Sequence, residues 1–205
     1  MLKRPLMVAM DLEGVLVPEI WIGVAEKTGI AELRLTTRDI ADYNQLMHHR
    51  MKLLAEHKIT LNDIQDVIAT LDPLPGAVEY MEWLRERYQC VILSDTFYEF
   101  AGPLMKKLGR PTIFCNNIHA DENGFVNGYT LRLPDGKRHA VLGFKQLNFS
   151  VVAMGDSYND TAMLKEAELG MLFRPSEKVV KEFPELPVVT EYREVMERIE
   201  GFVGK

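Results

Sequence analysis

The fold is decided by the stretch Leu6-Met7-Val8-Ala9-Met10-Asp11-Leu12-Glu13-Gly14-Val15. Its first five residues are all apolar, which is typical of a strand that is buried on both faces of a parallel sheet. Two acidic residues and a glycine follow where such a strand would end. In an open α/β sheet, ligands bind at the carboxyl ends of the strands. The stretch therefore predicts a core strand that carries Asp11 and Glu13 to a ligand-binding edge.

The same alternation continues through most of the chain. Short apolar runs predict strands, and helical patterns separate them, as in βα units of a parallel sheet. The predicted strands are Leu6–Met10, Cys90–Leu93, Thr112–Cys115, Val151–Met154 and Leu169–Leu172. The predicted helices are Ala77–Arg87, Phe97–Leu108, Arg138–Leu147, Thr161–Ala167, Glu177–Phe183 and Tyr192–Phe202. We therefore expect an α/β fold with a Rossmann-like parallel sheet at its core.

Two intervals interrupt the alternation. Residues 19–72 contain three helical stretches and no convincing strand, and Thr60 with Asp63 resembles a capping box. This pattern predicts a helical cap, residues 19–72, inserted into a core formed by residues 1–18 and 73–205. The second interval, Asn117–Leu133, contains two Asn-Gly pairs between short alternating runs and predicts a small β-hairpin.

Composition excludes several classes of function. The 205 residues carry a net charge of −6 and no long basic cluster, so nucleic acid is a poor candidate partner. No apolar run approaches the roughly 20 residues that a membrane span needs, and no signal peptide is recognisable. Cys90 and Cys115 lie far apart in apolar segments and are expected to be free thiols, which favours a cytoplasmic location. The oligomeric state stays open, with a homodimer among the expected assemblies.

Three polar clusters follow three of the predicted strands. They are Asp11-Leu12-Glu13-Gly14, Ser94-Asp95-Thr96 and Gly155-Asp156-Ser157-Tyr158-Asn159-Asp160. The carboxyl ends of neighbouring strands meet at one edge, so the clusters are expected to converge. Gathered carboxylates repel one another, and Mg²⁺ is a usual remedy because it takes oxygen ligands.

Each cluster, taken alone, also fits an ordinary structural role. Asp11 could be a turn carboxylate at a strand end. Asp156 and Asp160 could cap the helix that begins near Thr161, and Ser94 and Asp95 could cap the helix Phe97–Leu108. None of these roles explains why all three clusters occur together, each after a strand.

The three clusters resemble the motifs of haloacid-dehalogenase-superfamily phosphatases over the whole chain. The family's first motif, Asp-x-Asp-x-Thr/Val, reads Asp11-Leu12-Glu13-Gly14-Val15 here. The resemblance implies that Asp11 is the nucleophile and that it forms an aspartyl-phosphate. It also implies a Mg²⁺ ion held by Asp11, the Glu13 backbone carbonyl and Asp156, with Asp160 supporting these ligands from behind. Ser94 and Asn159 are expected to contact the substrate.

Two further residues complete the implied machinery. Glu13 stands where the family generally has an Asp that acts as acid and base, and its extra methylene extends the reach of the carboxyl group. The family also needs a cation that pairs with the phosphoryl group. Lys137 is preferred because Lys145 would lie about 12 Å further along the same helix; a neighbouring cation remains an alternative.

Within the superfamily, the chain looks most similar to phosphoserine phosphatases and their homoserine phosphotransferase relatives. The stretches Asp11–Trp21, Thr36-Thr37-Arg38-Asp39-Ile40 and Ser94–Phe100 carry this similarity. It implies that Glu19 and Arg50 bind the zwitterionic end of an amino acid, since Arg pairs with a carboxylate and Glu accepts from an ammonium group. Arg50 could instead belong to a solvated helix face with His48, His49 and Lys52.

The expected function is therefore a phosphoserine phosphatase that can also transfer the phosphoryl group to homoserine. A phosphatase for another small phosphate monoester is the enzyme alternative. A signalling receiver domain, which also phosphorylates an Asp at a strand end, is the alternative from another class. Such domains lack the helical cap and the acidic pair of Asp11 and Glu13.

Overall fold

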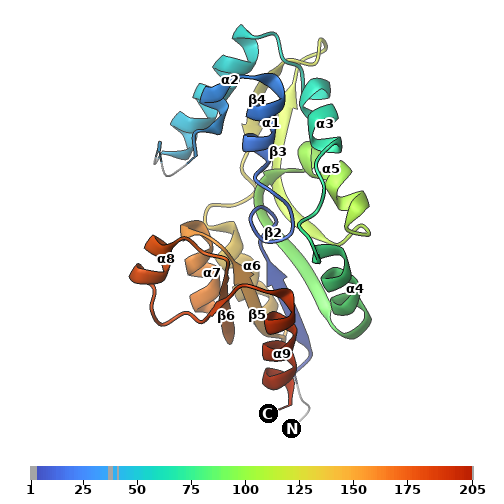
Figure 1. Ribbon diagram of the computed structural model, residues 1–205, viewed down its shortest axis with the longest axis vertical. Helices are drawn as coiled ribbons and strands as arrows, with labels where there is room; N and C mark the ends of the chain where they lie inside the picture. The colour runs from blue at the N-terminus through green and yellow to red at the C-terminus, as the bar shows by residue number, and fades with distance from the viewer. Residues whose placement is uncertain (1–3, 37–38, 41, 205) are drawn as a thin grey trace.

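A mostly parallel sheet forms the centre of the molecule (Figure 1). The computed structural model describes residues 4–36, 39–40 and 42–204. Within them the sheet has seven strands in the order β4-β3-β2-β1-β5-β6-β7. All neighbours are parallel except β3 and β4. The strands are β1 (Leu6–Met10), β2 (Gln89–Phe97), β3 (Ile113–Ala120), β4 (Val126–Thr130), β5 (Ser150–Gly155), β6 (Leu169–Phe173) and β7 (Val188–Val189).

Helices cover both faces of the sheet, as the alternating side chains of β1 show. Val8 and Met10 pack in the hydrophobic cluster that includes residues of α4 (Ala77–Arg87), α5 (Tyr98–Lys107) and α9 (Tyr192–Val203). Met7 and Ala9 pack in a second cluster, with residues of α6 (Gly136–Gln146), α7 (Thr161–Glu166) and α8 (Glu177–Glu182). This burial on both faces explains why β1 is apolar throughout.

A helical insert follows β1 and stands above the carboxyl edge of the sheet (Figure 1). It contains α1 (Ile20–Thr28), the 3₁₀ helix η1 (Ala31–Arg34), α2 (Tyr43–Glu56) and α3 (Leu61–Ala69). The predicted capping box is confirmed: the Thr60 side chain accepts from the Asp63 N–H, and the Asp63 side chain accepts from the Thr60 N–H. Apolar residues of the insert continue the cluster that contains Val8 and Met10, so the insert shares its core with the sheet.

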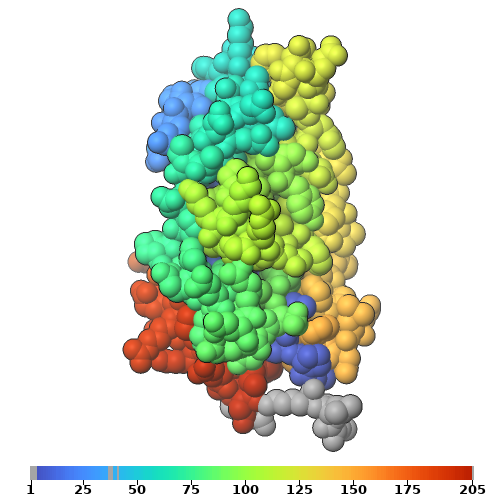
Figure 2. All heavy atoms as spheres, turned by 90° about the vertical axis from the view of Figure 1, so that its right-hand side faces the viewer, coloured from blue at the N-terminus to red at the C-terminus, as the bar shows by residue number. Residues whose placement is uncertain are grey.

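The predicted hairpin is present, but its first strand is the end of a core strand. β3 pairs in parallel with β2 near Ile113 and then antiparallel with β4 from Asn117 onward. The turn contains Gly124 at φ 84°, whereas the second Asn-Gly pair lies inside β4. The Gly124 carbonyl accepts from the Leu61 N–H at 2.8 Å, which joins the hairpin to the insert. Figure 2 shows the two side by side.

Two details of the sheet differ from the sequence prediction. Ser94-Asp95-Thr96 lies inside β2 rather than after it, because β2 continues to Phe97 through an irregular register. Strand β7 was not predicted, because two residues are too few to show a period. No helix of the described residues is long and apolar enough to cross a membrane. The predicted α/β fold, with its helical insert and hairpin, is otherwise confirmed.

Candidate active site

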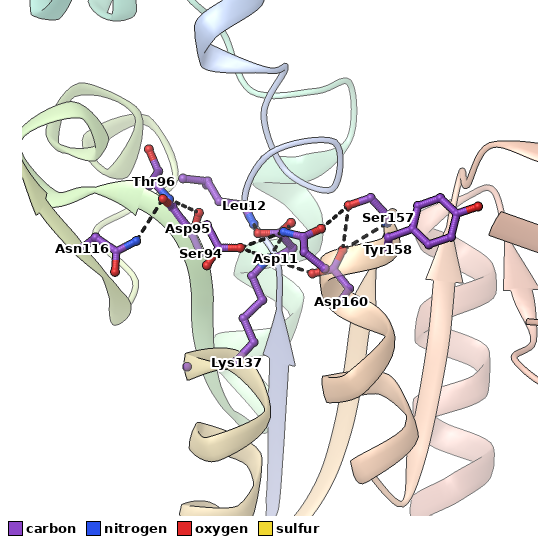
Figure 3. A network of polar contacts seen from close by, with 12 residues as sticks. Asp11, Leu12, Ser94, Asp95, Thr96, Asn116, Lys137, Ser157, Tyr158 and Asp160 are labelled. Carbon is purple, nitrogen blue, oxygen red and sulfur yellow. Dashed lines mark hydrogen bonds and ion pairs between the residues drawn. The ribbon is translucent and has the colours of Figure 1, made fainter. Parts of the chain in front are cut away.

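Asp11 is held at the end of β1 by contacts on both of its carboxylate oxygens. Its backbone N–H donates to the Met154 carbonyl of β5 at 2.9 Å, which extends the parallel ladder. Its Oδ1 accepts from the Leu12 N–H at 2.7 Å, and its Oδ2 lies 2.9 Å from Lys137 Nζ. The residue is 5% exposed. Asp11 therefore sits, fixed and nearly buried, at the centre of the polar network in Figure 3.

Lys137 provides the buried positive charge of this network. It lies in the first turn of α6, and its Nζ donates to Asp160 Oδ1 at 2.7 Å. Burial by itself lowers the pKa of Lys137, but Asp11, Asp160 and Asp95 together hold it well above its usual value. Lys137 is therefore protonated at physiological pH.

Lys145, the other candidate cation, is directed elsewhere. Its Nζ donates to the Glu166 carbonyl at 2.7 Å and lies 3.3 Å from the Glu166 carboxylate. These contacts join the far end of α6 to the end of α7. Of the two lysines, Lys137 alone has its ammonium group beside Asp11.

Asp160 organises the loop after β5. It is fully buried, and its Oδ2 accepts from the N–H groups of Asp156 and Ser157 at 3.0 and 3.1 Å. A Cβ atom on Gly155 would lie 2.3 Å from the Asp160 Cβ, so only glycine permits this approach. Since Oδ1 accepts from Lys137, Asp160 fixes both the loop and the cation.

Asp156 closes against the turn that follows β1. Gly14 has φ +75°, and a Cβ atom there would lie 2.6 Å from the Asp156 carboxylate carbon. Glycine is therefore needed at position 14 for two reasons, the positive φ and the close contact with Asp156. This contact places Asp156 next to the loop that carries Asp11 and Glu13.

The carboxylates have the chemistry to hold a divalent metal ion. Asp11, Asp156 and Asp160 each offer an oxygen atom, and these atoms lie within 4.8 Å of one another. They face one ammonium group, Lys137, which leaves excess negative charge. Burial and the Asp160 carboxylate raise the pKa of Asp11, and Lys137 opposes that shift. A hard cation with oxygen ligands would remove the excess charge.

Glu13 connects the turn after β1 to the start of α1. Its Oε2 accepts from the N–H of Ile20 at 2.8 Å, at the start of α1, which directs the side chain toward the insert. Burial and the Glu19 carboxylate raise the pKa of Glu13 to about 8, although the Ile20 N–H and Arg50 oppose the shift. At neutral pH this carboxyl group is mostly protonated.

Arg50 brings a buried guanidinium from the insert. It is 6% exposed, its Nη2 donates to the Leu35 carbonyl at 2.8 Å, and its Cζ lies 4.4 Å from the centroid of the Trp21 ring. Its Nε is buried without a hydrogen-bond partner among the described residues. Burial lowers the pKa of Arg50 to about 10, with Glu13 opposing, so the group stays charged at neutral pH. The alternative of a solvated helix face is thus wrong for Arg50.

Ser94 and Asn159 both lie next to Asp95. Ser94 is 7% exposed, and its Oγ accepts from the Thr96 N–H at 3.2 Å inside the irregular part of β2. Asn159 Nδ2 donates to Asp95 Oδ2 at 2.8 Å. Lys137 Nζ lies 3.8 Å from the same Asp95 oxygen. The second and third sequence clusters therefore touch, although β1 lies between β2 and β5 in the sheet.

One cavity of about 140 Å³ brings the predicted residues together. Those that line it are Asp11, Glu13, Glu19, Arg50, Ser94, Lys137, Asp156 and Asn159. Asp160 is the exception, because it lies beneath the cavity and holds Lys137. Thr36 also lines the cavity, whereas Thr37 and Arg38 of the same stretch lie outside the described residues.

Sequence reasoning missed two contributors to the cavity. Tyr43, at the start of α2, lines it and donates through its hydroxyl to the Asp95 carbonyl at 3.4 Å. Asp95 was recognised only as part of a cluster, and its contact with Asn159 spans 64 residues. Trp21 packs against Phe100 and also lines the cavity.

Comparison with known proteins identifies the family. Residues 7–168 match the family model described as haloacid dehalogenase-like hydrolase. The chain belongs to the haloacid dehalogenase-like hydrolases. Two curated members of similar sequence are the phosphoserine phosphatase ThrH of Pseudomonas aeruginosa and a phosphoserine phosphatase of Pseudomonas syringae pv. tomato. Each is 58% identical over 91% of this chain, which covers 91% and 78% of their lengths respectively.

Solved structures share the hydrolase fold. A structure described as a phospho-aspartyl intermediate analogue of phosphoserine phosphatase aligns with a TM-score of 0.77, at 20% identity. The alignment covers 96% of this chain and 99% of the other. At that identity the likeness supports the fold alone, with its parallel sheet and helical insert.

Proposed function

We propose that this hydrolase is a Mg²⁺-dependent phosphoserine phosphatase that carries the phosphoryl group on Asp11. The observation that carries the proposal is that one cavity joins the Asp11–Lys137 pair to the buried guanidinium of Arg50. A phosphorylated amino acid has an anionic group at each end, and the cavity has a cation for each. The names of the two relatives at 58% identity support the same substrate.

Arg50 and Glu19 are proposed to bind the amino-acid end. A buried guanidinium with a free Nε is costly unless an anion pairs with it, and a substrate carboxylate would supply that anion. Glu19 lines the same cavity and would accept from the ammonium group. Residues 19–72 would thus act as a cap domain over a core of residues 1–18 and 73–205. The substrate's charged head would contact the cap and its phosphoryl group the core.

Lys137, Ser94 and Asn159 are proposed to bind the phosphoryl group. Lys137 offers an ammonium group, Ser94 a hydroxyl and Asn159 an amide, and all three line the cavity beside Asp11. Mg²⁺ would be held by Asp11, the Glu13 backbone carbonyl and Asp156. Asp160 would support these ligands. When bound, the ion supplies positive charge that screens the nucleophile from the phosphate and stabilises the transferring oxygens.

The proposed reaction has two steps on the side chains of Asp11 and Glu13. An Asp11 carboxylate oxygen attacks phosphorus, the bond from phosphorus to the seryl oxygen breaks, and Glu13 donates its proton to that oxygen. The pKa of about 8 leaves Glu13 protonated for this step. Glu13, now ionised, then accepts a proton from an attacking water, which releases phosphate and regenerates Asp11.

Homoserine is proposed as a second acceptor in the same cavity. Its ammonium and carboxylate groups match those of serine, so Glu19 and Arg50 would hold it with its hydroxyl near phosphorus. Bulk water has the advantage of concentration, but well-oriented groups reach effective molarities of about 10⁵–10⁸ M. Partial orientation of the homoserine hydroxyl would therefore suffice for transfer. Glu13 would accept the hydroxyl proton, and its length relative to Asp would suit this larger acceptor.

The test is turnover of phosphoserine with Mg²⁺, with and without excess homoserine, followed by phosphorus NMR. We expect inorganic phosphate alone in the first case and additional O-phosphohomoserine in the second. Glu13→Asp should lower the fraction of transferred product. Detection of inorganic phosphate alone at every homoserine concentration would show that the protein hydrolyses phosphoserine without transferring the phosphoryl group to homoserine.

A panel of sugar and nucleotide monophosphates tests the substrate class. The account predicts that phosphoserine has the highest kcat/KM. A clearly higher kcat/KM for another monoester would contradict the proposal that the substrate is a phosphorylated amino acid. Fewer than one turnover per molecule with every substrate would instead favour a phosphorylated switch of the receiver type.

A further inference from the structure

A second, larger cavity adjoins the candidate active site. It has a volume of about 920 Å³ and is bordered by Tyr43 of α2 and by residues of α6, α7 and α8. Leu131 and Leu133, which are 42% and 43% exposed, form part of its wall. Five residues line both cavities: Tyr43, Asp95, Lys137, Tyr158 and Asn159. The two cavities are therefore contiguous, and the larger one is called the outer cavity below.

The hydrogen bond between Asp95 and Asn159 lies at the boundary of the two cavities. Asp95 Oδ2 accepts from Asn159 Nδ2 at 2.8 Å and lies 3.8 Å from Lys137 Nζ. The Asp95 side chain is 51% exposed, whereas Lys137 is 6% exposed. A half-exposed carboxylate thus engages two of the donors that face the proposed phosphoryl position.

We propose that Asp95 competes with the phosphoryl group for Asn159 and thereby weakens the binding of inorganic phosphate, the product. This inference rests on the proposed function, because it takes a phosphoryl group as the ligand beside Asp11. Asn159 Nδ2 carries two protons, and the proton that Asp95 accepts is withheld from a phosphoryl oxygen. The negative charge of Asp95 also repels the incoming phosphate at short range. Asp95 is therefore a positioning residue, and its removal tightens phosphate binding.

The effect is expected on binding rather than on the chemical step. Repulsion by Asp95 acts alike on the bound ester, the transition state and bound inorganic phosphate, since all three carry the phosphoryl charge in the cavity. A change that is equal in the ground and transition states alters KM and the inhibition constant and leaves kcat nearly unchanged. A merely structural role for Asp95 would lower kcat and the unfolding temperature instead.

The experiment measures the inhibition constant of inorganic phosphate against hydrolysis of an aryl phosphate with Mg²⁺. Asp95→Asn removes the charge and keeps an oxygen that accepts from Asn159, and Asp95→Ala removes both. We expect the constant to fall about tenfold in Asp95→Asn, which corresponds to about 1.4 kcal/mol, and at least as far in Asp95→Ala. An unchanged or higher constant in both variants would overturn the proposal.

Asp135→Asn is the matched control. Asp135 also lines the outer cavity, and its side chain is 44% exposed, but it pairs with Arg138 at 3.7 Å. Its neutralisation should change the constant by no more than about twofold, because solvent and salt screen exposed charges at a distance. If the inhibition constant fell equally in Asp135→Asn and Asp95→Asn, the effect would come from the total negative charge around the outer cavity. That result would overturn the proposal.

A double-mutant cycle tests the contact itself. Asn159→Ala should weaken phosphate binding more in the Asp95→Ala background than in the wild-type background, because Asn159 is then free of its competitor. Equal losses in both backgrounds would show that the two residues act independently and contradict the proposal.

Calorimetric titration of the Mg²⁺-loaded protein with inorganic phosphate separates this inference from the proposed function. It needs no turnover, so it reports on Asp95 even if phosphoserine is not a substrate. Absence of phosphate binding in all variants would overturn the inference, while phosphoserine turnover is judged by its own assay.

Discussion

Lys137 and Asp160 form a buried ion pair, with 2.7 Å between Nζ and Oδ1. The pair fixes the ammonium group 2.9 Å from Asp11 Oδ2. Because Asp160 also accepts two backbone N–H groups of the loop after β5, one carboxylate couples the position of the cation to that of Asp156. The first prediction concerns this cation.

Lys137→Ala should lower kcat/KM for phosphoserine about 10²–10³-fold, the range typical when one donor to the transition state is lost. Lys145→Ala is the matched control, because it removes the same group from the same helix but contacts Glu166. Its kcat/KM should stay close to the wild-type value. Thermal unfolding should accompany both assays, since Lys137→Ala also leaves buried carboxylates unpaired. Similar kinetic losses in the two variants would contradict the assignment.

Glu13→Gln should lower kcat about 10²–10⁴-fold, the usual contribution of a general acid and base. The amide oxygen can still accept from the Ile20 N–H, so the entry into α1 should keep its geometry. Steady-state hydrolysis of phosphoserine and a thermal melt are the measurements. A Glu13→Gln protein with the wild-type kcat near neutral pH would exclude Glu13 as the proton donor.

Arg50→Lys should keep the positive charge and lose the planar fork that matches a carboxylate. We expect kcat/KM for phosphoserine to fall by about one to two decades, or about 1.5–3 kcal/mol. An aryl phosphate without the amino-acid group should lose much less. Lys52→Ala, an exposed change on the same helix, is the control. Equal losses for both substrates would assign Arg50 to the fold or to the phosphate.

Much of this architecture was predictable because buried parallel strands appear in a sequence as short continuous apolar runs. Leu6–Met10 is apolar at every position and ends at an acidic residue, and the structure reproduces its bounds. Asp11 and Asp156 were likewise expected at one edge, since the carboxyl ends of parallel strands meet there. What local patterns do not show is where a strand bends.

The missed features depend on long-range contacts. Asp95 lies in the irregular end of β2 and contacts Asn159, which is 64 residues away in sequence. β3 continues into the hairpin because β4 pairs with its second half, which no periodicity in Thr112–Cys115 reveals. The tight approach of Gly14 to Asp156 is equally invisible until both loops are placed.

Asp156→Asn should raise the Mg²⁺ concentration needed for half-maximal rate, because an amide is a weaker ligand for a hard cation than a carboxylate. A shift of about tenfold or more is expected. Asp66→Asn, an exposed change on α3, is the control and should leave the Mg²⁺ titration unchanged. An unchanged titration in Asp156→Asn would remove this residue from the metal site.

The central claim, a phosphoryl group carried on Asp11, can be tested by trapping. The protein with Mg²⁺ is mixed with phosphoserine radiolabelled in its phosphoryl group, quenched in acid within the first turnover, and mapped by peptide mass spectrometry. The account predicts label on the peptide that contains Asp11, stable in acid and released by hydroxylamine, and none in folded Asp11→Asn. Turnover without any labelled protein, label on another residue, or steady-state activity in Asp11→Asn would contradict it.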